Sequence, residues 1–271
     1  MKYIQEKIPG AAGMIDVTAY VQDDLTQGRR ARGAVLVLGG GGYAYVSDRE
    51  TEPVALLLAA RGFNAYTVQY HVAPSRWPVP VQDAAAAMAW IRRRAAQDHT
   101  DPNRVAVMGF SAGGHLAGSL GVWWQDEALW RPLGLTPEEV RPNAMVLAYP
   151  VISGGEHAHR GSFACLTGSD DLAVHDRYSL EKAVTSAAPR TFLWHTWDDG
   201  AVPVQNTLLM AQALKEAGVT AEVHIYPHGS HGLSLCNELT DTCDPKLNAP
   251  YCAGWFDLAV RFLRGMGEAG D

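Results

Sequence analysis

Short apolar runs rich in β-branched residues alternate with helical patterns along most of the chain. These runs are Ala34–Leu38, Asn64–Tyr70, Arg104–Met108, Ala144–Ala148, Thr191–Trp194 and Ala221–Tyr226. Strands that are apolar throughout are typical of parallel sheets covered by helices on both faces. The alternation therefore predicts an α/β fold with a mostly parallel central sheet. In such sheets ligands bind at the carboxyl ends of the strands, so we expect the chemistry in the loops that follow them.

Helical patterns fill the segments between these runs. Glu52–Ala60 is expected to be a helix, and Gly62 suits its left-handed cap. Pro203 suits the first turn of a helix that Gly218 ends, and Trp255–Phe262 forms a closing helix. Another helix has one apolar stripe at helical spacing, which consists of Val81, Ala84, Met88, Ile91 and Ala95. An N-terminal part with strand-like pieces, Met14–Val21, precedes them.

Nothing in the 271 residues suggests a division into domains. No repeat, low-complexity tract or linker-like stretch interrupts them, and 47% of the residues are apolar, enough for a large core without disulfides or metal. We therefore expect one domain over residues 1–271. About forty residues separate the strand Ala144–Ala148 from Thr191, which is room for a modest cover but not for a large lid domain.

The net charge and the N-terminal sequence argue against several classes of binding partner and location. The net charge of -7 argues against nucleic acid and anionic membranes. The first ten residues lack the apolar segment of a secretory signal, and no apolar run approaches the roughly 18–20 residues of a membrane span. These features predict a soluble, cytoplasmic protein and leave its oligomeric state open. The four cysteines have no zinc-binding spacing, so we expect free thiols, with a single late disulfide as the alternative.

The segment Gly109-Phe110-Ser111-Ala112-Gly113 follows one predicted strand directly and opens a helix. This is the G-x-S-x-G pattern in the strand-turn-helix context that it requires. Only small residues fit two positions before and after the serine in so tight a turn, and the helix N-terminus favours developing negative charge. A chance glycine–serine turn is the alternative in a chain with 27 glycines. The strand, the turn and the helix follow one another in the required order, which favours Ser111 as a nucleophile.

Four glycines, residues 39–42, follow an earlier strand and precede Tyr43. Hydrolases with a serine elbow take one oxyanion donor from the residue after the nucleophile, here Ala112, and another from a glycine-rich loop. Gly41 and Gly42 are the candidates in that loop. A phosphate-binding loop is the rival interpretation, but the G-x-x-x-x-G-K-[ST] pattern is absent. The next strand also ends in Gln69, Tyr70 and His71 rather than in the acidic residue of a dinucleotide site.

The remaining members of a triad are expected in the order acid, then histidine. The loop after Thr191–Trp194 contains Asp198 and Asp199, and the loop after the last predicted strand contains His228 and His231. Both loops follow strands and would reach the edge of the sheet where Ser111 lies. Position alone leaves a choice within each pair.

The combined motifs resemble a family of small bacterial acetyl esterases and acetyl xylan esterases, with feruloyl-esterase relatives, which have the α/β-hydrolase fold. The resemblance extends from about Gly33 to the closing helix. The segments that carry it are Gly39–Tyr43, Glu52–Ala55, Gly109–Leu116, His157–Phe163, Asp198–Val204 and His228–Leu233. The chain departs from the family where Gly39 replaces a proline and in the segment from Cys236 to Cys252.

Residue by residue, the resemblance places the nucleophile at Ser111, the acid at Asp199 and the base at His231. It implies a serine carboxylic-ester hydrolase that removes small acyl groups, foremost acetyl, from carbohydrate esters such as acetylated xylo-oligosaccharides. The reaction passes through an acyl-enzyme and needs no metal or cofactor. A feruloyl esterase, a prolyl-oligopeptidase-like peptidase or amidase, and a non-catalytic binding module are the alternatives.

Three residues are candidate substrate contacts. Tyr43 ends the glycine loop, and the ring of Trp197 could stack on a sugar, although aromatic residues more often pack in a core. His157 belongs to a His157–His159 pair that lacks an evident third metal ligand. We therefore expect polar contacts in a substrate-covering loop, or plain surface histidines, rather than a metal site.

Overall fold

The computed structural model describes residues 1–28 and 30–267, and the strands in this part of the chain form one sheet. They are β1 (Lys2–Pro9), β2 (Met14–Val21), β3 (Arg32–Leu38), β4 (Asn64–Gln69), β5 (Thr100–Phe110), β6 (Ala144–Ala148), β7 (Arg190–Thr196) and β8 (Ala221–Tyr226). Their order is β1-β2-β4-β3-β5-β6-β7-β8. The strands from β4 to β8 in this order are parallel, and β2 is antiparallel to both β1 and β4. The predicted mostly parallel sheet is therefore confirmed.

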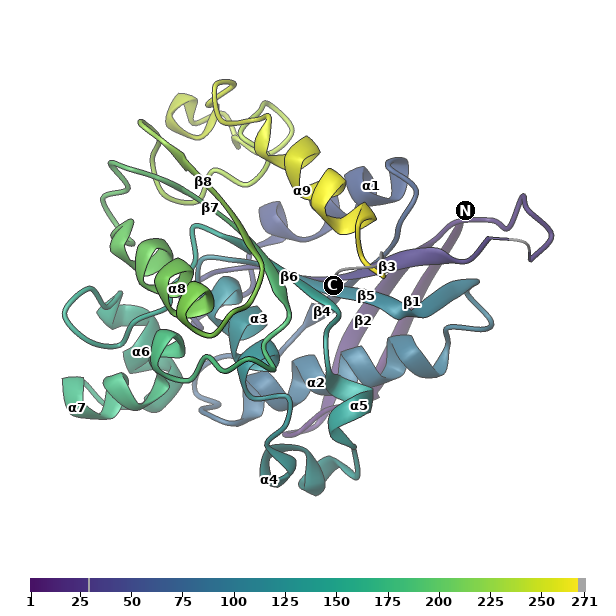
Figure 1. Cartoon of the computed structure of the whole chain (residues 1–271), viewed down its shortest axis with the longest axis horizontal. Coiled ribbons are helices and arrows are strands. Elements are labelled where there is room, and N and C mark those ends of the chain that lie inside the picture. The colour runs from purple at the N-terminus through teal and green to yellow at the C-terminus, as the bar shows by residue number, and fades with distance from the viewer. Residues whose placement is uncertain (29, 268–271) are drawn as a thin grey trace.

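Helices cover both faces of this sheet (Figure 1). The longer ones are α1 (Glu52–Ala60), α2 (Val79–Arg93), α3 (Ala112–Val122), α8 (Gln205–Glu216) and α9 (Trp255–Arg264). Helices α2, α3 and α8 pack on one face, and α1 and α9 pack on the other.

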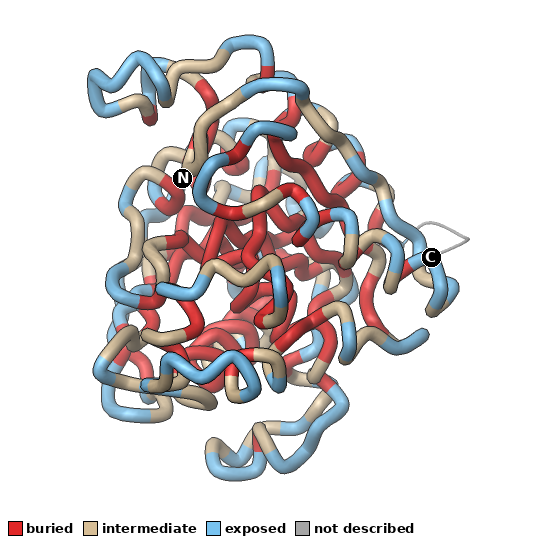
Figure 2. Tube along the Cα trace, turned by 90° about the vertical axis from the view of Figure 1, so that its left-hand side faces the viewer, coloured by how far each residue is buried: buried red, intermediate tan, exposed pale blue. Residues whose placement is uncertain are grey.

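Strand β3 explains why the central strands are apolar throughout. Leu36 belongs to the core beneath α2, α3 and α8, whereas Val35 and Val37 belong to the core beneath α1 and α9. Because successive side chains of a strand point to opposite faces, a strand buried on both sides needs apolar residues at every position. Buried residues accordingly fill the centre of the molecule and exposed ones its periphery (Figure 2).

Strand β1 is absent from the sequence-based prediction. It lies at the edge of the sheet, and among the described strands it pairs with β2 alone. Within β1 only Ile8 is buried, so the strand has no apolar pattern that would reveal it. Its charged residues are typical of an exposed edge strand.

The predicted helix ends agree closely with the structure. Gly62 and Gly218 adopt the left-handed conformation that was expected of them, with φ values of 93° and 74°. Pro203, however, lies before α8, which begins at Gln205.

Short helices form the cover between β6 and β7. They are α6 (Arg160–Thr167), α7 (Leu172–His175) and the 3₁₀ turns η3 (Asp176–Tyr178) and η4 (Leu180–Lys182). Two further short helices, α4 (Glu127–Trp130) and α5 (Pro137–Val140), precede β6. All four cysteines are free thiols. Within the described residues, no helix has the length and apolar character needed to cross a membrane.

Candidate active site

The turn between β5 and α3 holds Ser111 in a conformation that few non-glycine residues adopt. Its φ is 54° and its ψ is -120°. Such a conformation persists only where the surrounding structure enforces it. A Cβ atom at Gly109 would lie 2.0 Å from the carbonyl oxygen of Gly113, and one at Gly113 would lie 2.3 Å from that of Leu38. Both positions therefore require glycine, and the turn places Ser111 at the carboxyl end of the sheet, where it lines a cavity.

Ser111, His231 and Asp199 form one hydrogen-bonded chain. The Oγ of Ser111 lies 2.7 Å from Nε2 of His231, and Nδ1 of His231 lies 2.7 Å from Oδ2 of Asp199. An ionised Asp199 can only accept, so Nδ1 carries a proton and Nε2 is free to accept the serine proton. This is the arrangement in which a histidine can act as a general base toward a hydroxyl.

Several donors surround the carboxylate of Asp199. Its Oδ1 accepts the backbone N–H groups of Ala201 and Val202, each at 2.9 Å, and Oδ2 lies 3.3 Å from Nε2 of the buried His195. Burial raises the pKa of Asp199, but the hydrogen bonds from His195 and His231 outweigh burial and hold this pKa well below its ordinary value. Asp199 is therefore an anion at neutral pH.

Asp198 and His228 form a separate pair at the surface. Nδ1 of His228 lies 3.0 Å from Oδ2 of Asp198, and Oδ1 accepts the N–H of Gly229. The hydrogen bond from His228 lowers the pKa of Asp198, and both side chains are exposed. The structure thus separates the two candidates in each loop, because His231 rather than His228 contacts Ser111, and Asp199 rather than Asp198 contacts His231.

The glycine loop presents unpaired backbone donors beside Ser111. The N–H of Gly40 donates to Oε2 of Glu50 at 2.8 Å. Within the described part of the chain, no acceptor is found for the N–H groups of Gly41 and Gly42. Ala112 is the first residue of α3, where a backbone N–H has no partner inside the helix. Gly41, Gly42 and Ala112 thus offer three backbone donors near the serine that have no acceptor among the described residues.

Glu50 is a buried residue that the sequence-based analysis missed. It lies in the 3₁₀ turn η1 (Asp48–Glu50), and its Oε1 accepts the hydroxyl of Tyr149 at 2.6 Å. That hydroxyl accepts the N–H of Ser234 at 2.8 Å, three residues after His231. Glu50 therefore connects the glycine loop to the histidine loop. A glutamate just before an apolar helix is common, so no sequence signal distinguished it.

A cavity of about 370 Å³ opens above Ser111 and His231. It is lined by Gly41, Gly42, Tyr45, Ser47, Arg49, Glu50, Ser111, His159, His231 and Gly232. Nδ1 of His159 accepts the N–H of Ser162 at 3.3 Å, so the proton of its neutral ring lies on Nε2. Burial and, secondarily, the nearby His231 lower the pKa of His159, which keeps its ring neutral.

The structure contradicts the expectation that Tyr43 contacts substrate. Tyr43 is 1% exposed, and its hydroxyl lies 2.8 Å from Nδ1 of the buried His115. His157 does not line the cavity, and its partner in the pair, His159, does. Trp197 is 63% exposed but lies outside the residues that line the cavity. The residue after the glycines thus packs inward, while Tyr45, two positions later, reaches the cavity.

The burial of His115 gives a testable dependence of stability on pH. Burial lowers the pKa of His115 from 6.5 to about 4. Between these values the unfolded chain binds one more proton than the folded chain, so stability falls as the pH falls. We expect the parent to lose about 3 kcal/mol more than His115→Gln between pH 7 and pH 4. Urea unfolding at both pH values measures this difference, and equal losses would contradict it.

A family model and two relatives of known name each match most of this chain. A family model described as alpha/beta hydrolase fold matches residues 35–235. The chain is 34% identical over 225 residues to endo-1,4-beta-xylanase B of Butyrivibrio fibrisolvens and 32% identical over 209 residues to an acetylxylan esterase of Xylanibacter ruminicola. These matches cover 81% and 74% of this chain but only 35% and 41% of the relatives, which are much longer proteins.

Solved structures match over nearly their whole length. An acetyl ester-xyloside bifunctional hydrolase from Caldicellulosiruptor lactoaceticus has a TM-score of 0.78 at 37% identity, covering 95% of this chain and 90% of that one. A carboxylesterase from Lactobacillus plantarum has a TM-score of 0.85 at 29% identity, covering 98% of each chain.

Proposed function

This chain belongs to the alpha/beta hydrolase family, and from that premise we propose that it is a serine carboxylic-ester hydrolase acting on acylated carbohydrates. The acyl group is small, foremost acetyl, and the alcohol is a sugar, so that the substrate is an ester such as an acetylated xylo-oligosaccharide. The observation that carries the proposal is the hydrogen-bonded chain of Ser111, His231 and Asp199 beside free backbone donors.

In the first step His231 accepts the proton of Ser111 while the serine oxygen attacks the ester carbonyl. Asp199 holds the imidazole in the required tautomer and stabilises the positive charge that forms on it. The protonated His231 then donates its proton to the departing sugar oxygen. In the second step His231 takes a proton from water while the water oxygen attacks the acyl carbonyl. The protonated His231 then returns that proton to Oγ of Ser111 as the Oγ–acyl bond breaks and the carboxylic acid leaves.

Backbone donors stabilise the negative charge on the carbonyl oxygen during both steps. The N–H of Ala112 and those of Gly41 and Gly42 are the proposed donors, because they are near Ser111 and have no acceptor of their own in the described residues. Each such donor contributes about 3 kcal/mol to the stability of the transition state.

The size and lining of the cavity support the proposed substrate, a sugar that carries a small acyl group. A cavity of about 370 Å³ does not provide a broad groove for a long acyl chain. Tyr45 lines it and is 64% exposed, so its ring is available to stack on a sugar. The names of the acetylxylan esterase and the acetyl ester-xyloside hydrolase agree with this substrate class.

A panel of esters tests the proposal directly. We expect the purified chain to hydrolyse p-nitrophenyl acetate faster than p-nitrophenyl butyrate and to release acetate from acetylated xylo-oligosaccharides. Methyl ferulate should be a poor substrate. A fluorophosphonate probe should label Ser111, whereas absence of both labelling and turnover would indicate a binding module instead.

Substitution of Gly41 tests the glycine loop. A Cβ atom at this position would lie 2.2 Å from the carbonyl oxygen of Tyr45, and the φ of Gly41 is 113°. Gly41→Ala must therefore shift the loop, and we expect kcat to fall by about 10²–10³-fold, as for loss of one oxyanion donor. The measurement is kcat for p-nitrophenyl acetate.

Gly42→Ala is the matched control. A Cβ atom at Gly42 would have its nearest neighbour at 3.8 Å, so the loop has space for it. Alanine in the left-handed conformation costs about 1–2 kcal/mol of folding stability. We expect a much smaller fall in kcat than for Gly41→Ala. Equal effects of the two substitutions would argue against the loop geometry as the cause.

A further inference from the structure

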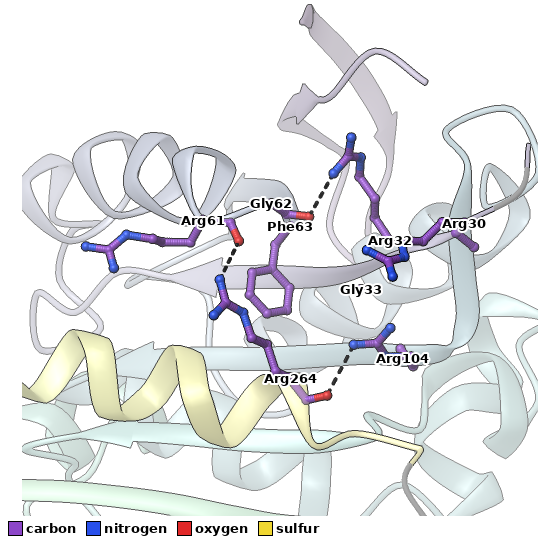
Figure 3. A pocket seen from close by; sticks show the side chains of 9 residues that line it. Arg30, Arg32, Gly33, Arg61, Gly62, Phe63, Arg104 and Arg264 are labelled. Carbon is purple, nitrogen blue, oxygen red and sulfur yellow. Dashed lines mark hydrogen bonds between the residues drawn. The ribbon is translucent and has the colours of Figure 1, made fainter. Parts of the chain in front are cut away.

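A second cavity, of about 460 Å³, lies at the opposite end of the sheet from Ser111. Ser111 follows the carboxyl end of β5, whereas this cavity adjoins the first residue of β3, Arg32, and the first half of β5. Five arginines from separate parts of the chain line it (Figure 3). They are Arg30, Arg32, Arg61, Arg104 and Arg264.

Only one of the five has a carboxylate partner among the residues that the structure describes. Arg61 forms an ion pair with Asp257, and its side chain points away from the cavity (Figure 3). The guanidinium groups of Arg30, Arg32, Arg104 and Arg264, which we call the arginine cluster, form no ion pair within residues 1–28 and 30–267.

The arginine cluster instead donates to backbone carbonyl groups over long distances. Arg32 reaches the carbonyl oxygens of Gly62 and Asp23, each at 3.4 Å. Arg104 reaches that of Arg264, and Arg264 reaches that of Arg61, each at 3.3 Å. These lengths exceed the usual 2.7–3.2 Å range of N–H···O bonds. Most donors of the cluster therefore have no close acceptor among the residues that the structure describes.

Two further observations indicate that donors of the arginine cluster lack acceptors among the described residues. The Nε atom of Arg104 is buried and has no hydrogen-bond partner among the described residues, a state that is costly for a donor. The guanidinium of Arg30 likewise has no hydrogen-bond or ion-pair partner among residues 1–28 and 30–267, and it lies over Gly33 toward Arg104 (Figure 3).

The arginine cluster concentrates positive charge in a chain whose net charge is -7. Like charges gathered around one cavity repel each other, and a bound anion would remove that repulsion. A guanidinium group binds phosphate oxygens through two parallel hydrogen bonds. A single carboxylate can form such a pair with only one arginine. Several arginines around one cavity therefore fit a ligand with several phosphate groups in a row.

We propose that the arginine cluster binds the polyphosphate part of a small anion, either inorganic polyphosphate or a nucleoside triphosphate. The cavity is lined by β3, β5, the end of α9 and the loops beside them, and its volume of about 460 Å³ suits a small molecule. Phe63 lines it but is buried, so it offers little ring surface on which a nucleobase could stack. Recognition is thus directed at the phosphate chain.

Calorimetric titration of the full chain with sodium tripolyphosphate, in a buffer of low ionic strength, tests this site. We expect saturable binding of one tripolyphosphate per chain, and similar affinity for ATP. Arg30→Gln and Arg104→Gln should each weaken binding by about 10- to 100-fold, the effect of losing one charge-assisted hydrogen bond. Arg30 is exposed and its side chain has no partner among the described residues, so we expect its substitution to leave the fold intact.

Arg131→Gln is the matched control, because Arg131 is exposed and lies outside the cavity but carries the same charge. It should leave the affinity within about twofold of the parent, as expected for a distant surface charge. The proposal would be overturned if Arg131→Gln and Arg30→Gln weakened the binding of tripolyphosphate equally. It would also be overturned if ATP bound and tripolyphosphate did not, or if neither showed saturable binding. Hydrolysis of p-nitrophenyl acetate by all three variants should equal that of the parent, so this test is independent of the proposed esterase function.

Discussion

Ser111→Ala is expected to lower kcat for p-nitrophenyl acetate by about 10⁶-fold, the loss typical of removing the nucleophile of a serine triad. The hydroxyl of Ser111 is the group that Nε2 of His231 contacts at 2.7 Å, and without it no acyl-enzyme can form. Alanine has the same backbone and fits the same turn, so the fold should persist. Turnover, fluorophosphonate labelling and circular dichroism measure these three consequences.

Ser119→Ala is the matched control for this substitution. Ser119 is buried in α3, the same helix that Ser111 precedes, and its hydroxyl has no hydrogen-bond partner in the described residues. Removing it should leave turnover unchanged. Near-normal turnover in Ser111→Ala, or an equally severe loss in Ser119→Ala, would refute Ser111 as the nucleophile.

Asp199→Asn is expected to lower kcat by about 10⁴-fold, as when a triad histidine is held in the wrong tautomer. Oδ1 of Asp199 accepts the N–H groups of Ala201 and Val202, so the amide oxygen of asparagine must remain there. Its NH₂ group then faces Nδ1 of His231 and donates to it. Nδ1 becomes the acceptor and Nε2 carries the proton, which leaves Ser111 without a base.

Asp198→Asn separates the two neighbouring aspartates. Asp198 pairs with His228 at the surface, where solvent screening leaves such a pair little effect on stability. We therefore expect kcat to be almost unchanged. Loss of activity in Asp198→Asn together with its retention in Asp199→Asn would reverse the assignment of the acid. The measurement is again kcat for p-nitrophenyl acetate, with urea unfolding as a check on the fold.

Local sequence patterns predicted an element correctly where the residues that determine it lie within one short segment. The apolar runs predicted β3 to β8 because strands buried on both faces need apolar residues at successive positions. The elbow was equally local, since Gly109 and Gly113 are required by backbone atoms within a few residues or on the adjacent strand. Strand β1 was missed because its exposed edge position demands no apolar pattern.

Choices between neighbouring residues depended on which way each side chain points after folding. Asp198 and Asp199 have the same chemistry and nearly the same place in the chain, and only their contacts with His228 and His231 separate them. Tyr43 looked available to a substrate, yet its hydroxyl packs inward on His115 of α3. These outcomes depend on packing against elements far away in the sequence.

By itself the sequence determined the parallel sheet, the helices on its two faces and the serine turn, because burial of apolar surface and the sterics of the backbone act within short segments. Only the tertiary structure decided that Glu50 joins two loops beside Ser111 and that Arg30 and Arg264, near opposite ends of the chain, face one cavity. The physical reason is that hydrogen bonds and charges act over a few ångströms in space. The folded path of the chain, not spacing along it, sets those distances.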